Sequence, residues 1–198
     1  FQKQLGRLYD VEELEKLNLL KYYDFQSKYA PSVRKNVESL LGKKAEGETI
    51  EIISGIHVPN VCNFYEQEIS HLNEYYIKNH YMAYIHGDLN GKNIIIDAQN
   101  NVWLIDFFHT RRGHVLCDLI KMENDLLYIF TKIENEEELR EAMKLSDLLI
   151  NVPDLGLLLD EKNSQSFKSP KLQRAYLAIR KLRSFFIPMI ELDRDPYQ

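Results

Sequence analysis

Apolar residues recur at every third or fourth position over much of the chain, and this spacing is typical of helices with one buried face. In the first 80 residues it predicts a helix over 11–28, a second over 32–41 and an aromatic-rich third over 64–79. The β-branched run Thr49–Ile53 predicts a short strand between the last two helices. This part of the chain is therefore expected to be mainly helical.

The second half of the chain contains both strand-like and helix-like patterns of apolar residues. Two β-rich runs, Asn93–Asp97 and Val102–Asp106, flank an Asn-rich turn and predict a β-hairpin. Helices are predicted after it over 118–130, 136–150 and 170–190, the last with a proline in its first turn. The fold class expected from the whole pattern is α+β, mostly α, with a small β-hairpin beside a helical bundle.

Composition and charge narrow the class of protein. Hydrophobic residues make up 44% of the 198 positions, which is enough for one substantial core. The formal net charge of −5 disfavours a nucleic-acid-binding surface. No apolar run approaches the ~20 residues that cross a membrane and no signal-peptide pattern is present, so we expect a cytoplasmic protein with no membrane partner. Basic residues of the last helix are expected on its solvent face: Lys171, Arg174, Arg180, Lys181 and Arg183.

Candidate chemistry concentrates in the segment His86-Gly-Asp-Leu-Asn-Gly-Lys-Asn93 and in Ile105-Asp106-Phe107 at the end of the hairpin. Phosphoryl transfer needs a group that orients a hydroxyl, and oxygen ligands that hold Mg²⁺ against phosphates. Asp88 lies on a loop, where its carboxylate can orient the hydroxyl. The hairpin brings Asp106 beside Asn93, and both side chains offer oxygen atoms to Mg²⁺.

With these residues, the stretch 85–126 resembles the catalytic core of the aminoglycoside-phosphotransferase (APH-like) and protein-kinase-like superfamily. The form His-Gly-Asp, in place of the His-Arg-Asp of protein kinases, is closer to the small-molecule phosphotransferase branch. More narrowly, the motif together with Trp103–Phe107, Gly113-His114 and Asp118 is similar to kinase-like modules of multidomain bacterial conflict or signalling proteins. The resemblance implies the helical C-terminal lobe of a protein-kinase-like fold.

Carried onto this sequence, the resemblance implies that Asp88 is the catalytic base of an ATP- and Mg²⁺-dependent phosphotransferase, that is, a kinase. Asn93 and Asp106 would be the Mg²⁺ ligands. Together with Lys92, which would lie near the transferred phosphate, these two residues would contact the bound ATP. The γ-phosphoryl group of ATP would pass to the hydroxyl group of an acceptor.

Five further residues acquire expected roles or qualify the resemblance. It implies that His86 braces the loop and that Asp118, at a helix start, accepts hydrogen bonds from amides of the catalytic loop. Arg111 and Arg112 are candidate contacts for an anion, because paired guanidinium groups suit phosphate oxygens. Phe108 stands where a protein kinase has Gly, which again favours the small-molecule branch.

The resemblance makes residues 1–198 one kinase-like lobe. In this division 1–80 form the hinge-side and acceptor region, 81–130 the catalytic loop, hairpin and metal-binding loop, and 131–198 the C-terminal helices. Upstream of the motif the sequence contains neither a Gly-rich strand-turn-strand nor a Val-Ala-Ile-Lys-like strand. The nucleotide-covering N-lobe is therefore expected outside this chain, in the same polypeptide, and the isolated chain is expected to be inactive.

Two other functions stay open. One is a non-catalytic, pseudokinase-like module that serves in interaction or nucleotide sensing. The other is a metal-dependent hydrolase in which His86, Asp88, His109 and His114 hold a transition metal, since imidazole and carboxylate groups suit such ions. For the leading hypothesis, the acceptor of the phosphoryl group could be a small molecule, a protein side chain or a nucleotide.

Overall fold

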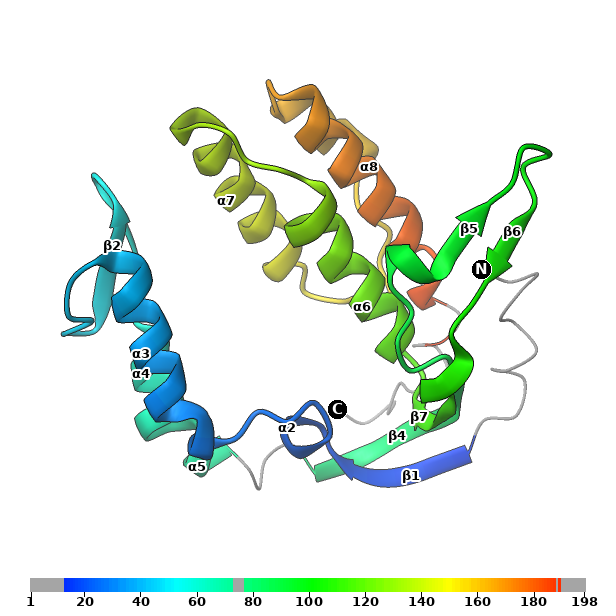
Figure 1. The fold of residues 1–198 in the computed structure, drawn as a ribbon, viewed down its shortest axis with the longest axis horizontal. Helices are drawn as coiled ribbons and strands as arrows, with labels where there is room; N and C mark the ends of the chain where they lie inside the picture. The colour runs from blue at the N-terminus through cyan, green and yellow to red at the C-terminus, as the bar shows by residue number, and fades with distance from the viewer. Residues whose placement is uncertain (1–12, 73–76, 188, 190–198) are drawn as a thin grey trace. The chain divides into compact units, whose positions relative to one another are not determined.

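The computed structural model describes residues 13–72, 77–187 and 189. It has the α+β class expected from the sequence, with helices as the larger part. The chain divides into two compact units, one formed by 15–80 and the other by 1–14 with 81–198. Figure 1 colours the first unit from blue to blue-green and most of the second from green to red.

The unit of 15–80 contains one longer helix and a hairpin. Helix α3, Ala30–Leu41, has Pro31 in its first turn and ends at Gly42 in a left-handed conformation. Strand β2, Thr49–Ile53, pairs antiparallel with β3, Ile56–Pro59. Shorter elements complete the unit: α2 Leu19–Tyr22, η2 Ser27–Tyr29, α4 Val61–Asn63, the π-helix η3 Phe64–Glu68 and α5 Ile69–Leu72. Its buried core consists of Ala45, Ile50 and Cys62, against which Val37, Leu41, Ile52 and Val58 pack.

Two of the predicted helices are wrong in part. Where the leucine spacing predicts a helix over 11–28, strand β1, Glu13–Asn18, occupies the first part, only the short helix α2 follows in full, and residues 11 and 12 lie outside the described range. This charged segment is an edge strand in the sheet order β1-β4-β7, a position that favours charged side chains. The helix predicted over 64–79 ends at Leu72, and β4, Ile77–Ile85, follows residues 73–76, which lie outside the described range.

In the unit of 1–14 and 81–198, strand β4 ends directly before the polar motif. The last part of β4 pairs antiparallel with β7, Arg111–His114. The predicted hairpin is confirmed as β5, Ile94–Ile96, paired with β6, Val102–Leu104. Short 3₁₀ helices flank it: η4 Gly91–Asn93 before β5 and η5 Phe107–His109 after β6.

Three helices follow at the predicted positions, but the last ends at Arg183 rather than at 190. Helix α6, Cys117–Asn124, continues as the π-helix η6, Asp125–Phe130. Helix α7, Glu136–Ile150, begins with an N-cap in which the Asn135 side chain accepts a hydrogen bond from the Glu138 amide. After the 3₁₀ helix η7, Glu161–Ser166, comes α8, Pro170–Arg183; residue 190, the predicted end, lies outside the described range. Helix α8 contacts both α6 and α7 (Figure 1).

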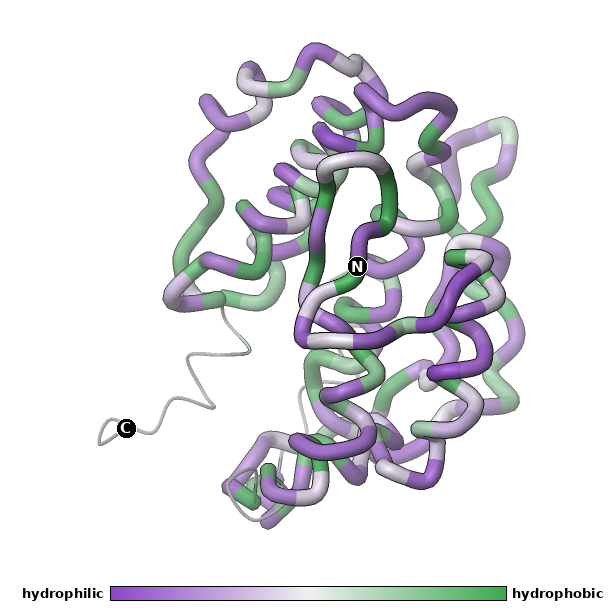
Figure 2. The backbone as a smooth tube through the Cα atoms, turned by 90° about the vertical axis from the view of Figure 1, so that its left-hand side faces the viewer, coloured by the Kyte–Doolittle hydropathy of each residue, from purple (hydrophilic) through white to green (hydrophobic). Residues whose placement is uncertain are grey.

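Two apolar clusters hold this unit together, and Figure 2 shows hydrophobic positions interleaved with polar ones along its helices. The first lies under the motif and joins β4, the loop after it and α6: Ala83, Ile85, Leu89, Val115, Leu116, Leu119, Phe186 and Met189. The second joins α7, η7 and α8: Leu145, Leu149, Leu159, Phe167, Leu172, Ala175, Tyr176 and Ile179. Among the described helices, none is long and apolar enough to span a membrane.

The prediction that the basic residues of α8 all lie on its solvent face is wrong for Arg183. This side chain is buried and forms two hydrogen bonds, of 2.7 and 2.9 Å, with the Glu123 carboxylate of α6. It also donates to the backbone carbonyl of Leu149. A buried arginine with a bidentate carboxylate partner and a carbonyl partner is compatible with the apolar interior, because its charge and donors are satisfied.

Candidate active site

The loop His86–Asn93, here called the catalytic loop, connects β4 to β5. At its start Ile85 is fully buried, and in its middle Leu89 inserts into the first apolar cluster. At its end the Asn90 side chain accepts a hydrogen bond from the Lys92 amide and starts η4. The loop is thus anchored by two buried apolar side chains, while its polar residues are left for other contacts.

Asp118, in the first turn of α6, fixes the start of the catalytic loop. Its two carboxylate oxygens accept hydrogen bonds from the amides of His86, at 2.7 Å, and Gly87, at 2.9 Å. These are the contacts that the resemblance implied for this residue. The carboxylate is buried, and its position at a helix N-terminus adds the favourable interaction of a negative charge with the helix dipole.

Two further residues of the same helix contact the catalytic loop, and the sequence analysis did not single them out. The Asp125 carboxylate accepts a hydrogen bond of 2.9 Å from the Gly91 amide. The Lys121 ammonium lies 3.2 Å from a carboxylate oxygen of Asp88. Spacings of three and four residues bring side chains to one face of a helix, so Asp118, Lys121 and Asp125 form what we call the loop-facing side of α6 and η6.

Gly87 allows the catalytic loop to pass close to the segment that follows Asp106. Its φ of +81° lies in the left-handed region, and a Cβ atom there would lie 2.2 Å from the backbone oxygen of His109. The same Cβ would lie 2.7 Å from a guanidinium nitrogen of Arg111. Only glycine combines this backbone conformation with this close approach.

Asp88 is held at both carboxylate oxygens. Lys121 contacts Oδ1, while the Asn90 amide at 3.2 Å and the Asn93 amide at 3.4 Å donate to Oδ2. Burial raises the pKa of Asp88, but the hydrogen bonds from Lys121 and Asn90, with the positive charges of Lys121 and His109, outweigh it and lower the pKa below its ordinary value. Asp88 is therefore ionised at neutral pH and can accept a proton or a hydroxyl hydrogen bond.

Asn93 is buried, and the rest of the site fixes the direction of its side chain. Its amide nitrogen donates to the backbone oxygen of Asp88 at 2.8 Å, so its amide oxygen is the atom that can serve as a metal ligand. The backbone oxygen of Asn93 accepts from the Ile105 amide at 3.1 Å, which extends the β5–β6 ladder by one pair. Asn93 is thus the cross-strand neighbour of Ile105, the residue directly before Asp106.

Asp106 is exposed and has a left-handed backbone, with φ +63° and ψ +59°. For a non-glycine residue this conformation costs about 1 kcal/mol or more and occurs preferentially at functional sites. His86 holds the backbone on either side: its Nε2 donates to the Ile105 carbonyl at 2.9 Å, and its ring packs on Phe107 with centroids 4.8 Å apart. The Asp106 carboxylate is therefore presented by a fixed turn.

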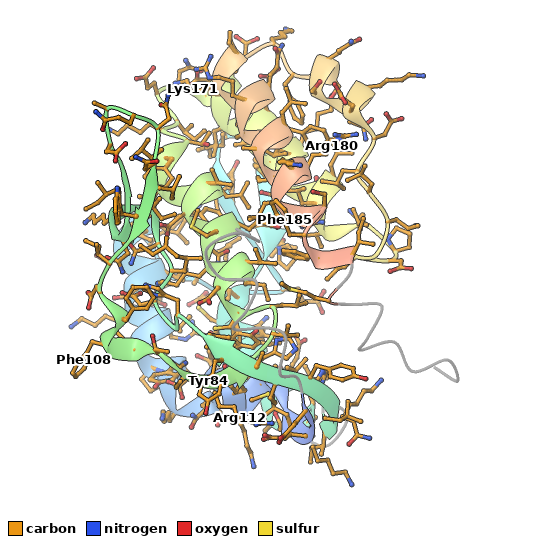
Figure 3. The ribbon with its side chains drawn as sticks, turned by 90° about the vertical axis from the view of Figure 1, so that its right-hand side faces the viewer. Tyr84, Phe108, Arg112, Lys171, Arg180 and Phe185 are labelled. Carbon is orange, nitrogen blue, oxygen red and sulfur yellow. The ribbon has the colours of Figure 1, made fainter. Side chains whose placement is uncertain are left out.

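The four remaining predicted residues lie around this centre with different surroundings. Lys92 is exposed on η4. Arg111 is exposed, lies opposite Ile85 in the β4–β7 pair and donates to the His109 carbonyl at 3.3 Å. Arg112 instead forms an ion pair of 2.7 Å with Glu13, so of the two arginines Arg111 is the better placed for an anion. Figure 3 shows Arg112 low on the second unit and Phe108, 88% exposed, pointing outward.

Two metal sites were expected from the sequence, one for a transition metal and one for Mg²⁺, and the structure treats their residues differently. Among the described residues no three His, Cys, Asp or Glu side chains are grouped to hold an ion, so the set predicted for a transition metal, which included His109 and His114, is not assembled. Asn93 and Asp106 provide amide and carboxylate oxygens from adjacent strand ends. This donor set fits Mg²⁺, which commonly takes one or two protein oxygens and completes its shell with water and phosphate.

A surface hollow of about 310 Å³ lies next to Asp106, on the hairpin. It is lined by Asn101, Val102, Trp103, Leu104 and Phe107. Trp103 is 58% exposed there and donates its indole hydrogen to Asp97 at 3.0 Å. The site therefore has an apolar surface beside the polar centre.

Comparison with known proteins places the chain in one family. No curated protein and no solved structure matches it. The family model described as ternary complex associated domain 9 matches residues 39–198. This range includes all of α6, α7 and α8, the catalytic loop and the hairpin, and it covers most of the chain. The chain therefore belongs to the ternary complex associated domain 9 family.

Proposed function

We propose that the protein is an ATP- and Mg²⁺-dependent phosphotransferase and that this chain supplies its kinase-like C-terminal lobe. The observation that carries the proposal is the arrangement of three side chains. Asp88 is ionised on a loop that the loop-facing side of α6 and η6 holds at several points, while Asn93 and Asp106 come from adjacent strand ends next to it. Positioning and electrostatic stabilisation are the main requirements of phosphoryl transfer.

In the proposed reaction Asp88 is the proton acceptor and ADP is the leaving group. The acceptor hydroxyl donates its proton to the Asp88 carboxylate while its oxygen attacks the γ-phosphorus of ATP. The bond between the γ-phosphorus and the oxygen that bridges to the β-phosphate breaks, and ADP leaves. Because Asp88 has a lowered pKa, it acts mainly by orienting the hydroxyl and takes the proton late in the transfer.

Asn93 and Asp106 are the residues that would hold Mg²⁺. When bound, Mg²⁺ neutralises negative charge on the phosphates. The side chain of Asn93 is oriented by its hydrogen bond to the Asp88 backbone, and the turn at Asp106 is held by His86. Lys92 and Arg111, both exposed beside the catalytic loop, are the candidate contacts for phosphate oxygens.

The ATP would also need cover from a second lobe. The sequence contains no Gly-rich hairpin before the motif, so we assign that lobe to another part of the same polypeptide. The isolated chain would then have little or no activity. A need for ATP agrees with the cytoplasmic location expected from the sequence.

A second candidate is a non-catalytic module that senses nucleotides or joins a complex. The family description, which names a domain associated with a ternary complex, favours it. The enzyme and the nucleotide sensor both require the polar centre to bind nucleotide, whereas a module that only joins a complex does not. The enzyme and the sensor differ in whether Asp88 is needed for turnover.

The test measures Mg²⁺-ATP consumption by the complete protein and by its Asp88→Asn variant. We expect a loss of about 10³-fold in kcat, within the range observed when a catalytic acid or base is removed. Asp147→Asn, on the exposed side of α7, is the matched control and should retain full activity. Equal turnover by wild type and Asp88→Asn contradicts the role of Asp88, and ATP binding with no turnover by either protein identifies the sensing module.

A further inference from the structure

The two oxygens of the Asp88 carboxylate are unequally occupied. An ionised carboxylate offers about four acceptor positions, two on each oxygen. Asn90 and Asn93 both donate to Oδ2, whereas among the residues that the structure describes Lys121 alone contacts Oδ1. An incoming hydroxyl therefore finds its acceptor position on Oδ1, next to the Lys121 ammonium.

The position of the helix brings Lys121 to the catalytic loop. Asp118, three residues earlier, and Asp125, four residues later, each accept hydrogen bonds from amides of the catalytic loop. These contacts fix the register of α6 and η6 against the loop on both sides of Lys121. Its side chain is 42% exposed, so the ammonium borders the side from which a substrate approaches Asp88.

We propose that Lys121 is a positioning residue of the phosphotransfer site, which fixes Asp88 Oδ1 as the oxygen that receives the proton of the acceptor hydroxyl. This inference rests on the proposed phosphotransferase function. The ammonium lies beside the attacking oxygen and faces the negative charge of the γ-phosphoryl group. A fixed positive charge at this point stabilises the transition state more than the ground state, because negative charge gathers on the oxygens of the group in transfer.

A purely structural role for the Lys121 pair predicts something different. Ion pairs with both side chains partly exposed contribute little to stability, and here the two side chains are 42% and 31% exposed. Asp118 and Asp125 already hold the loop without Lys121. Replacing Lys121 should therefore leave the melting temperature nearly unchanged, and any large kinetic effect must come from the site itself.

The experiment compares three variants of the complete protein in the Mg²⁺-ATP consumption assay. Lys121→Met removes the charge at similar length, Lys121→Arg keeps a cationic donor, and Lys132→Met alters an exposed lysine beyond η6 as the matched control. We expect Lys121→Met to lower kcat by about 10- to 100-fold with KM for Mg²⁺-ATP changed by less than about threefold. Lys121→Arg should recover most of the lost kcat, and Lys132→Met should match wild type.

Each other result overturns the inference. If Lys121→Met turns over at the wild-type rate while Asp88→Asn does not, Lys121 has no positioning role and the proposed function stands. If Lys121→Arg is as slow as Lys121→Met, the cationic donor is not what the site needs. If wild type consumes ATP no faster than Asp88→Asn, the positioning role and the proposed function fall together.

Discussion

The α7–α8 pair and the catalytic loop belong to the same unit, but different forces hold them. The core between the two helices is apolar, and Ile179 and Leu172 are almost completely buried in it, while the Lys171–Glu138 ion pair and the Arg183 hydrogen bond to Leu149 add polar contacts. The catalytic loop, besides its apolar anchor Leu89, depends on directed hydrogen bonds that its backbone amides donate to the Asp118 and Asp125 carboxylates. Apolar packing accepts many side chains of similar volume, whereas a carboxylate bound to an amide needs particular atoms at particular places.

Under the proposed function, this difference separates residues that maintain the fold from residues that place the catalytic groups. A change between α7 and α8 should lower stability and leave the turnover of folded molecules intact. A change on the loop-facing side of α6 and η6 should lower turnover by more than the lost stability explains. The following variants test that separation, from the largest expected effect on stability to the smallest.

Ile179→Ala tests the apolar side of the comparison. Ile179 is fully buried between α7 and α8, so removing its outer carbons should lower the free energy of unfolding by about 3 kcal/mol. Urea unfolding followed by circular dichroism measures the change. At a temperature where the variant remains folded, kcat should equal that of wild type; a kcat lowered tenfold would show that this core also governs the site.

Asp118→Ala tests the polar side. Two amides of the catalytic loop, that of His86 buried and that of Gly87 partly buried, would lose their acceptor, at a cost of about 2 kcal/mol in unfolding free energy. Turnover should fall by at least about 100-fold, since small displacements of catalytic groups have effects of this size. Asp118→Asn retains one acceptor oxygen, so its turnover should lie between those of wild type and Asp118→Ala. Wild-type turnover in Asp118→Ala would contradict the role of this helix in placing Asp88.

Gly87→Ala and Gly91→Ala form a matched pair within the loop. The new methyl at Gly87 meets backbone atoms of His109 and requires a left-handed conformation, so we expect a loss of about 1–2 kcal/mol and a strong loss of turnover. At Gly91 the methyl meets only the ring of Phe130, an exposed side chain that can turn aside. Thermal melting and ATP turnover of both variants should rank Gly91→Ala much closer to wild type.

The hairpin tip gives the smallest effect, which is local and depends on pH. Hydrogen bonds from Trp103 and Asn101 lower the pKa of Asp97 from 3.8 to about 2. Because the folded hairpin favours the ionised form, this contribution is complete above pH 3.8 and is lost as the pH falls through about 2. Trp103 is the only tryptophan, so its indole NH resonance should move in this range. In Asp97→Asn the pH-dependent shift should disappear.

Local signals in the sequence were sufficient for most helices and for the hairpin. Asn135 before α7, Pro170 at the start of α8 and the Asn-rich turn between β5 and β6 each act within a few residues. The wrong predictions occur where a segment's structure depends on a strand that is distant in the sequence. The segment Glu13–Asn18 has leucines at helical spacing, yet its place beside β4 makes it a strand, and no pattern within six residues can encode that neighbour.

The site followed the same rule. The motif was sufficient to predict Asp88, Asn93 and Asp106 as candidate site residues, because their spacing along the chain carries the information. Lys121 and Asp125 were missed, since their roles depend on a loop more than 30 positions away. Their signal was nevertheless present: polar residues at 118, 121 and 125 alternate with the apolar positions 119, 122 and 126 on the same helix.

The hydrogen bonds that Asp118 and Asp125 accept from the catalytic loop also set an order of assembly. They join residues 31 to 34 positions apart, whereas the β5–β6 turn closes within a few residues. Closing a long segment of chain costs more entropy and proceeds more slowly than forming a hairpin or a helix. The hairpin and α6 should therefore form first and the catalytic loop should close onto them last, so that a nascent chain acquires its site only after α6 has left the ribosome.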